Sequence, residues 1–234
     1  MPFEDVKKIW MNGRLVDFAD AKIHALSHVI HYGSGIFEGI RSYPTKQGPA
    51  VFRLNEHIRR LFDGAHIYRM EVPYTQEEVR KACLDIIVAN EFGDCYLRPL
   101  VYRGFHSLGV FPGACPIDVM IAAWKWGKYL GPEALEQGVD IRVSSWTRMA
   151  PNTFPAMAKT AANYMNSQLI RMEAAIDGYS EAIALDTSGF VSEGSGENVF
   201  VVRDGRIHTP SLTSSILPGI TRDTVVTLAR EMGI

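Results

Sequence analysis

The stretch Met149–Ile170, MAPNTFPAMAKTAANYMNSQLI, holds one charged residue, Lys159, in a chain of which 21% is charged. Ala158 and Thr160 flank it, so no carboxylate stands beside the ammonium group in the sequence. If this segment is buried, desolvation favours the neutral amine, which is the nucleophile that forms a Schiff base with a carbonyl group. The alternative is an ordinary surface lysine, because lysines are mostly exposed. The rest of the chain has to decide between the two.

The composition is that of an ordinary soluble globular protein. The chain has a net charge of −2 and is 47% hydrophobic. Its 234 residues are long enough for one large domain or two smaller ones. No basic patch predicts a nucleic-acid partner, and no apolar run predicts a membrane span or a signal peptide. Three widely spaced cysteines, Cys83, Cys95 and Cys115, are typical of reduced thiols. We therefore expect a cytoplasmic protein.

Residues 24–43, HALSHVIHYGSGIFEGIRSY, contain two patterns that resemble well-known motifs only in part. His24, His28 and His31 could face one side of a helix, but no carboxylate or cysteine completes a known metal-ligand spacing. We expect packed histidines and no metal. The glycines at 33, 35 and 39 do not match the dinucleotide fingerprint. They indicate a close approach of the backbone to something bulky.

The periodicity predicts alternating helices and strands. Helices are expected from Asn55 as an N-cap, from the capping box at Thr75 and Glu78, through the second half of 149–170 to Ile176, and after Pro218-Gly219. Strands are expected at 96–102, 117–124 and 139–146, with a meander over 181–208. The glycine-rich segment 126–138, WGKYLGPEALEQG, is the best linker. We therefore predict domains over 1–125 and 139–234, with 126–138 as the loop between them.

Several charged side chains and one helix start are candidates for ligand binding. Arg98 interrupts the apolar run YLRPLVY, so it either extends to an edge or meets an anion. Glu193 and Glu197 lie among glycines in SEGSGENVF, either in a polar turn or beside a planar ligand. The backbone amides of Gly219, Ile220 and Thr221 would form an anion cup at a helix start.

These segments, in this order, resemble the branched-chain amino acid aminotransferases, a fold-type-IV pyridoxal-phosphate family. The matching stretches are HYGSGIFEGIR, EHIRRL, YLRPLVYRG, WGKYLG, APNTFPAMAKTAANYMNS, GYSEAIALDTSGFVSEGSGENVF and LPGITRD. They lie between residues 24 and 232 and so cover nearly the whole chain. The resemblance implies an α+β fold with an N-terminal α/β sandwich and a C-terminal pseudo-barrel. It also implies pyridoxal 5'-phosphate as cofactor.

The resemblance assigns cofactor roles to particular residues. Lys159 matches the lysine that carries the cofactor as a Schiff base and moves the substrate proton, and Glu193 matches the carboxylate beside the pyridine nitrogen. Tyr164 matches the phenol that binds the 3′-oxygen of the cofactor. The phosphate group would be held by Arg60 and by the segment that opens the last helix, which includes Leu217, Gly219, Ile220 and Thr221.

The resemblance also implies the reaction and the substrate pocket. The expected reaction is transfer of the amino group of leucine, isoleucine or valine to 2-oxoglutarate. Arg98, with Tyr32, matches the group that meets the glutamate side chain, which favours the anion interpretation of Arg98. In the family Tyr32 and Val110 reach in from a neighbouring subunit, so at least a homodimer is implied. The wall of the pocket matches Tyr32, Phe37, Tyr96, Val110, Trp126, Tyr129 and Tyr164.

Two further expectations concern the end of the chain and the neighbouring activities. Family members continue past the last helix with a Gly-Thr-Ala loop at the cofactor phosphate, whereas this sequence stops at Ile234. We expect an incomplete pseudo-barrel, from a fragment or a truncation. The same fold houses D-amino acid aminotransferases and aminodeoxychorismate lyases, and a cofactor-free binding homologue is a further alternative.

Overall fold

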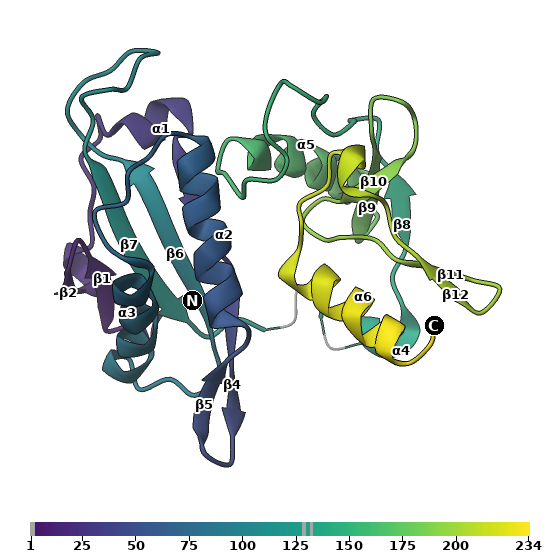
Figure 1. Cartoon of the computed structure of the whole chain (residues 1–234), viewed down its shortest axis with the longest axis horizontal. Helices are drawn as coiled ribbons and strands as arrows, with labels where there is room; N and C mark the ends of the chain where they lie inside the picture. The colour runs from purple at the N-terminus through teal and green to yellow at the C-terminus, as the bar shows by residue number, and fades with distance from the viewer. Residues whose placement is uncertain (1–2, 128–129, 132) are drawn as a thin grey trace. The chain divides into compact units, whose positions relative to one another are not determined.

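The chain folds into two compact units. The computed structural model describes residues 3–127, 130–131 and 133–234. The first unit comprises Met1–Gly127 together with the short segment Ala158–Ala162, and the second comprises Lys128–Met157 and Asn163–Ile234 (Figure 1). The stretch around Lys159 is therefore divided, because its middle residues belong to the first unit and its flanks to the second.

The first unit is built on an antiparallel sheet. Its hydrogen-bonded order is β2-β1-β7-β6-β4-β5, and β3 also pairs with β6. Strand β6 is central and pairs along its whole length with β7, so that Arg98 lies opposite Ala122. The strands are β1 (Lys8–Met11), β2 (Arg14–Asp17), β3 (Gly35–Phe37), β4 (Ile40–Thr45), β5 (Gly48–Val51), β6 (Cys95–Arg103) and β7 (Ile117–Trp124).

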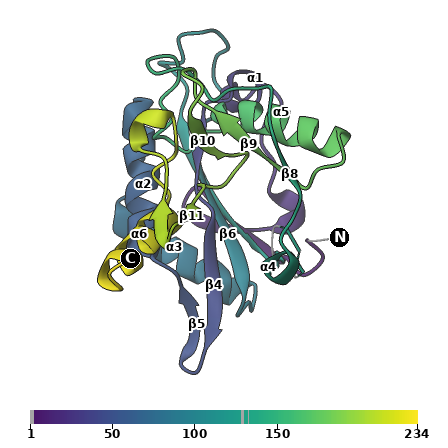
Figure 2. The same cartoon turned by 90° about the vertical axis from the view of Figure 1, so that its right-hand side faces the viewer.

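Two long helices pack on one face of this sheet, as Figures 1 and 2 show. Helix α3 (Gln76–Ala89) contacts β1, β6 and β7, while α2 (Leu54–Ile67) contacts β3 and α3. The buried apolar residues of both helices and of the sheet form one core cluster, which includes Ile58, Leu61, Val79, Ile86, Leu97, Val101 and Ile121. The apolar residues that recur about every 3.6 positions therefore form the inward face of each helix. The short helices η1 (Phe18–Asp20) and α1 (His28–Tyr32) precede β3.

The two predicted helix starts differ in outcome. The capping box at Thr75 is confirmed, because its hydroxyl accepts from the Glu78 backbone and the Glu78 carboxylate accepts from the Thr75 backbone. The prediction that Asn55 caps α2 is wrong. The N-cap residue is Arg53, two residues before Asn55, and it has a left-handed conformation and no side-chain cap hydrogen bond. Among the described residues, no helix is long and apolar enough to cross a membrane.

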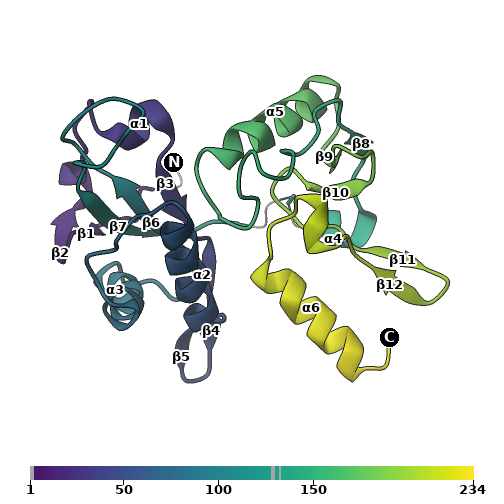
Figure 3. The same ribbon diagram turned by 45° about the horizontal axis from the view of Figure 1, so that its top comes forward.

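The second unit is a smaller arrangement of a sheet and helices. Strands β10, β9 and β8 form a sheet in that order, with β8 and β9 parallel. Helix α5 lies along this sheet and contacts β9, where Ile170 and Ala174 pack against Ala182 and Ala184 (Figure 3). The elements are α4 (Ala134–Gln137), β8 (Ile141–Val143), α5 (Asn163–Ile176), β9 (Glu181–Leu185), β10 (Val191–Gly194), β11 (Val201–Arg203), β12 (Arg206–His208), η2 (Leu212–Ser214) and α6 (Ile220–Glu231).

Backbone hydrogen bonds attach Ala158–Ala162 to strand β3. The amide of Phe37 donates to the carbonyl of Lys159 at 2.9 Å, and the amide of Ala161 donates to the carbonyl of Gly35 at 2.8 Å. Gly64 of α2 allows helix and segment to come close. A Cβ at Gly64 would lie 2.8 Å from a methyl group of Ile36 and 3.8 Å from Cβ of Ala158. The position of Lys159 is thus fixed by main-chain bonds and by a missing side chain.

We predict that Gly64→Ala destabilises the protein although alanine is the better helix former. The helix propensity gain is about 1 kcal/mol, whereas overpacking against Ile36 costs about 1–3 kcal/mol. The measurement is the free energy of unfolding in urea, with Gly93→Ala as control because nothing lies within 4 Å of a Cβ built at Gly93. A Gly64→Ala protein that is more stable than the wild type would contradict this packing.

Candidate active site

The side chain of Lys159 is half-buried in the first unit, where charged groups of Glu38, Arg60 and Arg98 act on its amine. Burial of its amino group lowers the pKa to about 8, an effect that Arg60 reinforces and the charge of Glu38 opposes. The amine also lies over the ring of Phe37, 5.0 Å from its centroid. Near neutral pH a useful fraction of this amine is unprotonated, whereas an exposed lysine titrates at about 10.4. The predicted desolvated, nucleophilic lysine therefore has a physical basis in the structure.

A buried carboxylate holds Arg60. Both nitrogens on one edge of the Arg60 guanidinium donate to Glu38, Nε at 2.7 Å and Nη2 at 2.8 Å, and His57 Nδ1 lies 2.8 Å from the same carboxylate. The Glu38 side chain is completely buried. Burial by itself would raise the pKa of Glu38, but the bonds from His57 and Arg60 outweigh it and hold the pKa below its ordinary value. Glu38 is therefore ionised despite its burial.

Arg98 is surrounded by aromatic rings. Its guanidinium carbon lies 4.6 Å from the ring centroid of Phe37, 5.2 Å from that of Tyr96 and 5.7 Å from that of Trp124. Arg98 Nη2 donates to the hydroxyl of Tyr96 at 3.0 Å. Gly39 leaves the space for this hydroxyl, since a Cβ there would lie 2.1 Å from it. Arg98 thus has a neutral protein partner, Tyr96, and stacks on rings as guanidinium groups favour.

The remaining predicted pocket residues of the first unit are distributed in two places. The ring of Trp126 packs 4.7 Å from that of Tyr96, in the group around Arg98. Tyr32, at the end of α1, instead stacks on His28 at 4.4 Å, and Val110 is 91% exposed in the connection between β6 and β7. His28 links these two, because its Nε2 lies 2.9 Å from the carbonyl of Gly109. Tyr129, also predicted, lies outside the described residues.

The three histidines predicted to pack all have partners in the first unit. His24 stacks on Phe105 at 4.0 Å, and His31 Nε2 contacts the carbonyl of Ala25 at 2.9 Å. His28 Nδ1 contacts the hydroxyl of Ser34 at 2.7 Å. In the part of the chain that the structure describes, no three His, Cys, Asp or Glu side chains are grouped as metal ligands are.

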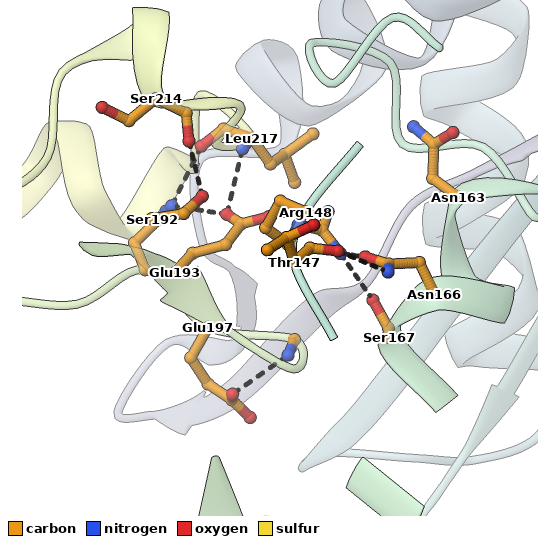
Figure 4. A network of polar contacts seen from close by, with 12 residues as sticks. Thr147, Arg148, Asn163, Asn166, Ser167, Ser192, Glu193, Glu197, Ser214 and Leu217 are labelled. Carbon is orange, nitrogen blue, oxygen red and sulfur yellow. Dashed lines mark hydrogen bonds and ion pairs between the residues drawn. The ribbon is translucent and has the colours of Figure 1, made fainter. Parts of the chain in front are cut away.

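In the second unit, Glu193 is the centre of a polar network (Figure 4). Arg148 pairs with Oε1 of Glu193 at 2.8 Å, and the backbone amide of Leu217 donates to Oε2 at 3.0 Å. Arg148 is oriented by α5, because its Nη1 donates to Asn166 at 2.8 Å and to Ser167 at 3.3 Å. A buried carboxylate paired in this way to a guanidinium is held as the anion.

Asn198 joins Glu193 to the start of helix α6. Its amide nitrogen donates to Glu193 at 3.2 Å and to the carbonyl of Leu217 at 3.0 Å. Gly219 is the N-cap residue, and a Cβ there would lie 2.1 Å from the amide oxygen of Asn198. Ile220 and Thr221 are the first two helical residues, so their amides point toward the helix N-terminus, which favours anions. Tyr164 is half-buried in the first turn of α5.

Glu197, the second glutamate singled out in the sequence, has a different environment. Burial raises its pKa to about 7, and the nearby carboxylates of Glu181 and Glu193 add to the effect. The amide of Gly196 donates to it at 3.1 Å, and Arg171 opposes the shift. Glu193 has a guanidinium 2.8 Å away, whereas Glu197 has mainly negative neighbours. The geometry therefore favours Glu193 as the carboxylate that stays charged.

Sequence reasoning missed four residues that organise these two clusters: Glu38, His57, Arg148 and Asn198. Glu38 stands alone between Phe37 and Gly39, and an isolated carboxylate in a glycine-rich apolar stretch is the signal that could have found it. His57 and Arg60 lie three apart on one helix face. Arg148 carries no such signal, because its contacts come from segments distant in sequence, and Asn198 depends in part on the distant carbonyl of Leu217.

Comparison with known proteins shows which class of enzymes the chain belongs to. A family model described as amino-transferase class IV matches residues 35–234. The chain therefore belongs to the class IV aminotransferases, and the fold class that the sequence implied is confirmed.

Its relatives narrow the class to one family. The chain is 53% identical to the branched-chain-amino-acid aminotransferase of Escherichia coli strain K12, over 97% of this chain and 74% of that protein. Its counterpart in Pseudomonas aeruginosa is 47% identical, over 96% of this chain and 73% of that protein. A crystal structure of the E. coli enzyme superposes with a TM-score of 0.96 at 52% identity, covering 98% of this chain and 76% of that chain. The chain is a member of the branched-chain amino acid aminotransferase family.

We predict that Glu197→Gln stabilises the protein at pH 8 but not at pH 5. A carboxyl group with a raised folded-state pKa favours folding while it is protonated, and that contribution is lost as the pH rises from 4.5 through about 7. Glutamine stays neutral, so the gain at pH 8 should be about 1–3 kcal/mol. The measurement is urea unfolding at both pH values, with exposed Glu136→Gln as control. Equal effects at both pH values would contradict the environment described for Glu197.

Proposed function

We propose that this chain uses pyridoxal 5'-phosphate to transfer the amino group of leucine, isoleucine or valine to 2-oxoglutarate. The observation that carries the proposal is the half-buried Lys159, whose amine is desolvated to a pKa of about 8 and feels the charge of Arg60. Two solved structures of one relative support it. In the first, a branched-chain amino acid aminotransferase is complexed with N-(5'-phosphopyridoxyl)-L-glutamate, and it superposes with a TM-score of 0.92 at 45% identity. In the second, that enzyme is complexed with 4-methylvaleric acid.

The residues present fit the chemistry of this cofactor. An aldehyde requires an unprotonated amine, and the pKa of about 8 gives Lys159 a reactive fraction of that form near physiological pH. A phosphate group requires cations and amide donors, which Arg60 and the start of α6 at Ile220 and Thr221 offer. A protonated pyridine nitrogen requires a carboxylate that remains ionised, and the ion pair with Arg148 favours that form of Glu193. Lys159, Arg60, Ile220, Thr221 and Glu193 are the residues that the family resemblance proposed for these roles.

The cofactor, when bound, supplies an electron sink for the carbanion formed at the substrate α-carbon. Lys159 serves first as the nucleophile that tethers the cofactor and then, through Nζ, as the base that accepts the α-proton. Glu193 would hold a proton on the ring nitrogen, and Tyr164 would orient the ring through its phenol. On the family resemblance, Arg60 and the residues Leu217, Gly219, Ile220 and Thr221 would bind the phosphate. These roles follow the family resemblance and the donor chemistry of each side chain.

The surroundings of Arg98 suit a pocket that has to accept two kinds of substrate side chain. With an aliphatic substrate, Arg98 keeps its bond to Tyr96 and its contacts with the rings of Phe37 and Trp124. Within the described residues its buried Nε has no hydrogen-bond partner, which suits a carboxylate arriving from glutamate or 2-oxoglutarate. Phe37, Tyr96 and Trp126 then form apolar walls, and we include Tyr129 on the family resemblance alone.

We further propose that the protein works in the cytoplasm as a homodimer or a larger homo-oligomer. Tyr32 and Val110 would complete a neighbouring subunit's pocket, and the 91% exposure of Val110 supports such a role for its loop. We keep 126–138 as the interdomain loop, supported by the division between compact units after Gly127. Domains over 1–125 and 139–234 remain our proposal.

Lys159→Ala tests the proposed function directly. We expect it to abolish transamination of L-leucine, because no other amine can replace a positioned nucleophile. The measurement is the spectral change of the bound cofactor when L-leucine, L-glutamate or D-alanine is added to wild type and variant. A wild type that responds to D-alanine and not to L-leucine would instead indicate a D-amino acid aminotransferase. A wild type that never binds the cofactor would indicate a binding homologue.

Arg98→Met tests the dual pocket. Loss of a charge-assisted hydrogen bond should cost about 1.5–3 kcal/mol, or one to two decades in the half-reaction with L-glutamate. The half-reaction with L-leucine should stay within a few-fold, since methionine fills the space among the rings. Single-turnover kinetics of both half-reactions measure the two effects. Equal losses would show that Arg98 binds the shared α-carboxylate or supports the fold.

A further inference from the structure

The buried carboxylate of Glu38 is an expensive feature that the fold alone does not explain. Removing a carboxylate and a guanidinium from water costs several kcal/mol for each ion, and apolar replacements of buried ion pairs are often neutral or stabilising. Yet Glu38 is completely buried beside Arg60, whose side chain is 11% exposed. It lies directly after β3, the strand to which the Lys159 segment is bonded. A buried charge in this position calls for a role beyond packing.

The geometry of the pair fixes one edge of Arg60. Glu38 receives Nε and Nη2 of Arg60 in parallel, at 2.7 and 2.8 Å, which sets the plane and the rotation of the guanidinium. His57, three residues before Arg60 on α2, bonds to the same carboxylate at 2.8 Å. The Glu38 backbone amide donates to the carbonyl of Pro99 at 2.9 Å, so the carboxylate is anchored to β6. With one edge held, Arg60 presents its Nη1 side in a fixed direction.

We propose that Glu38 is a positioning residue for cofactor binding: it orients Arg60 toward the phosphate group, and His57 in turn orients Glu38. The inference rests on the proposed function, in which Arg60 binds the phosphate. It is supported by the lowered pKa of Glu38, which keeps the carboxylate charged. The charge of Glu38 raises the pKa of Lys159, whereas that of Arg60 lowers it. The two charges therefore largely cancel beside the reactive amine.

A positioning role and a merely structural role predict different binding behaviour. If Glu38 acts through Arg60, its loss should weaken only ligands that carry a phosphate group. If Glu38 only joins β3 to α2, its loss should weaken every ligand of the site. Pyridoxal 5'-phosphate and pyridoxal separate the two cases, because they share the ring and the aldehyde and differ in the phosphate.

The experiment measures the dissociation constants of pyridoxal 5'-phosphate and pyridoxal for the cofactor-stripped chain. Glu38→Gln keeps the shape of the side chain and removes its charge, whereas Arg60→Lys keeps the charge and removes the planar fork. Each should raise the ratio of the dissociation constant of pyridoxal 5'-phosphate to that of pyridoxal by about tenfold to a hundredfold, because any change in the amine of Lys159 acts on both ligands alike. The double variant should be no weaker than the weaker single variant, because both changes break one interaction.

Matched controls guard against general damage. Arg103→Lys alters another largely buried arginine, which donates to the carbonyls of Tyr68 and Arg69 and not to Glu38, so it should leave the ratio of the two constants unchanged. If Glu38→Gln does not fold, His57→Leu replaces it in the comparison of single and double variants with Arg60→Lys. His57→Asn should restore the ratio, because its amide nitrogen can take the place of Nδ1.

The outcomes separate this inference from the proposed function. An unchanged ratio of the two dissociation constants in Glu38→Gln, together with a raised ratio in Arg60→Lys, overturns the positioning role alone. Equal weakening of both ligands by Glu38→Gln overturns it in favour of a structural role. An unchanged ratio in Arg60→Lys overturns the assignment of Arg60 to the phosphate, and the inference fails with it.

Discussion

Desolvation of the amine of Lys159 is the physical effect on which the chemistry of this protein depends. Burial lowers the pKa of this lysine to about 8. The burial is produced by the main-chain pairing of Ala158–Ala162 with β3 and by the close approach that Gly64 permits. The antiparallel sheet and the helices α2 and α3 therefore do more than form a core. They hold the segment Ala158–Ala162 in place, and the resulting burial of the Lys159 amine lowers its pKa and so increases the fraction that can act as a nucleophile.

The charges around this amine allow a fraction of it to be neutral near physiological pH, and the ions beside it have partners of their own. Arg60 lowers the pKa of Lys159, and Glu38 both holds Arg60 and opposes that effect. Arg98 is stacked against aromatic rings and bonded to a phenol, so it needs no carboxylate of its own. The second unit follows the same rule, since the Glu193 carboxylate is paired with Arg148. Glu38, Arg98 and Glu193 thus each have a partner that fixes the direction of the side chain.

The sequence predicted those parts of the molecule whose signals are local. The capping box at Thr75 and the apolar face of α2 follow from spacing within one helix, and Lys159 stood out because its segment lacks other charges. The start of α2 was missed because a left-handed Arg53 precedes it, a conformation that the residue type does not announce. Glu38 and Arg148 were missed because their partners lie elsewhere in the chain. Pairing of distant charges is decided by topology, which no single sequence window contains.

The most direct measurement of the central claim is the pH dependence of the reactivity of Lys159. The cofactor-stripped protein would be treated with a limiting amine-acylating reagent across a pH series, and modification at Lys159 quantified by peptide mass spectrometry. The account predicts an inflection near pH 8, where burial places the pKa of this amine. An inflection near the ordinary lysine value of about 10.4 would show that the amine is hydrated, and would contradict the account.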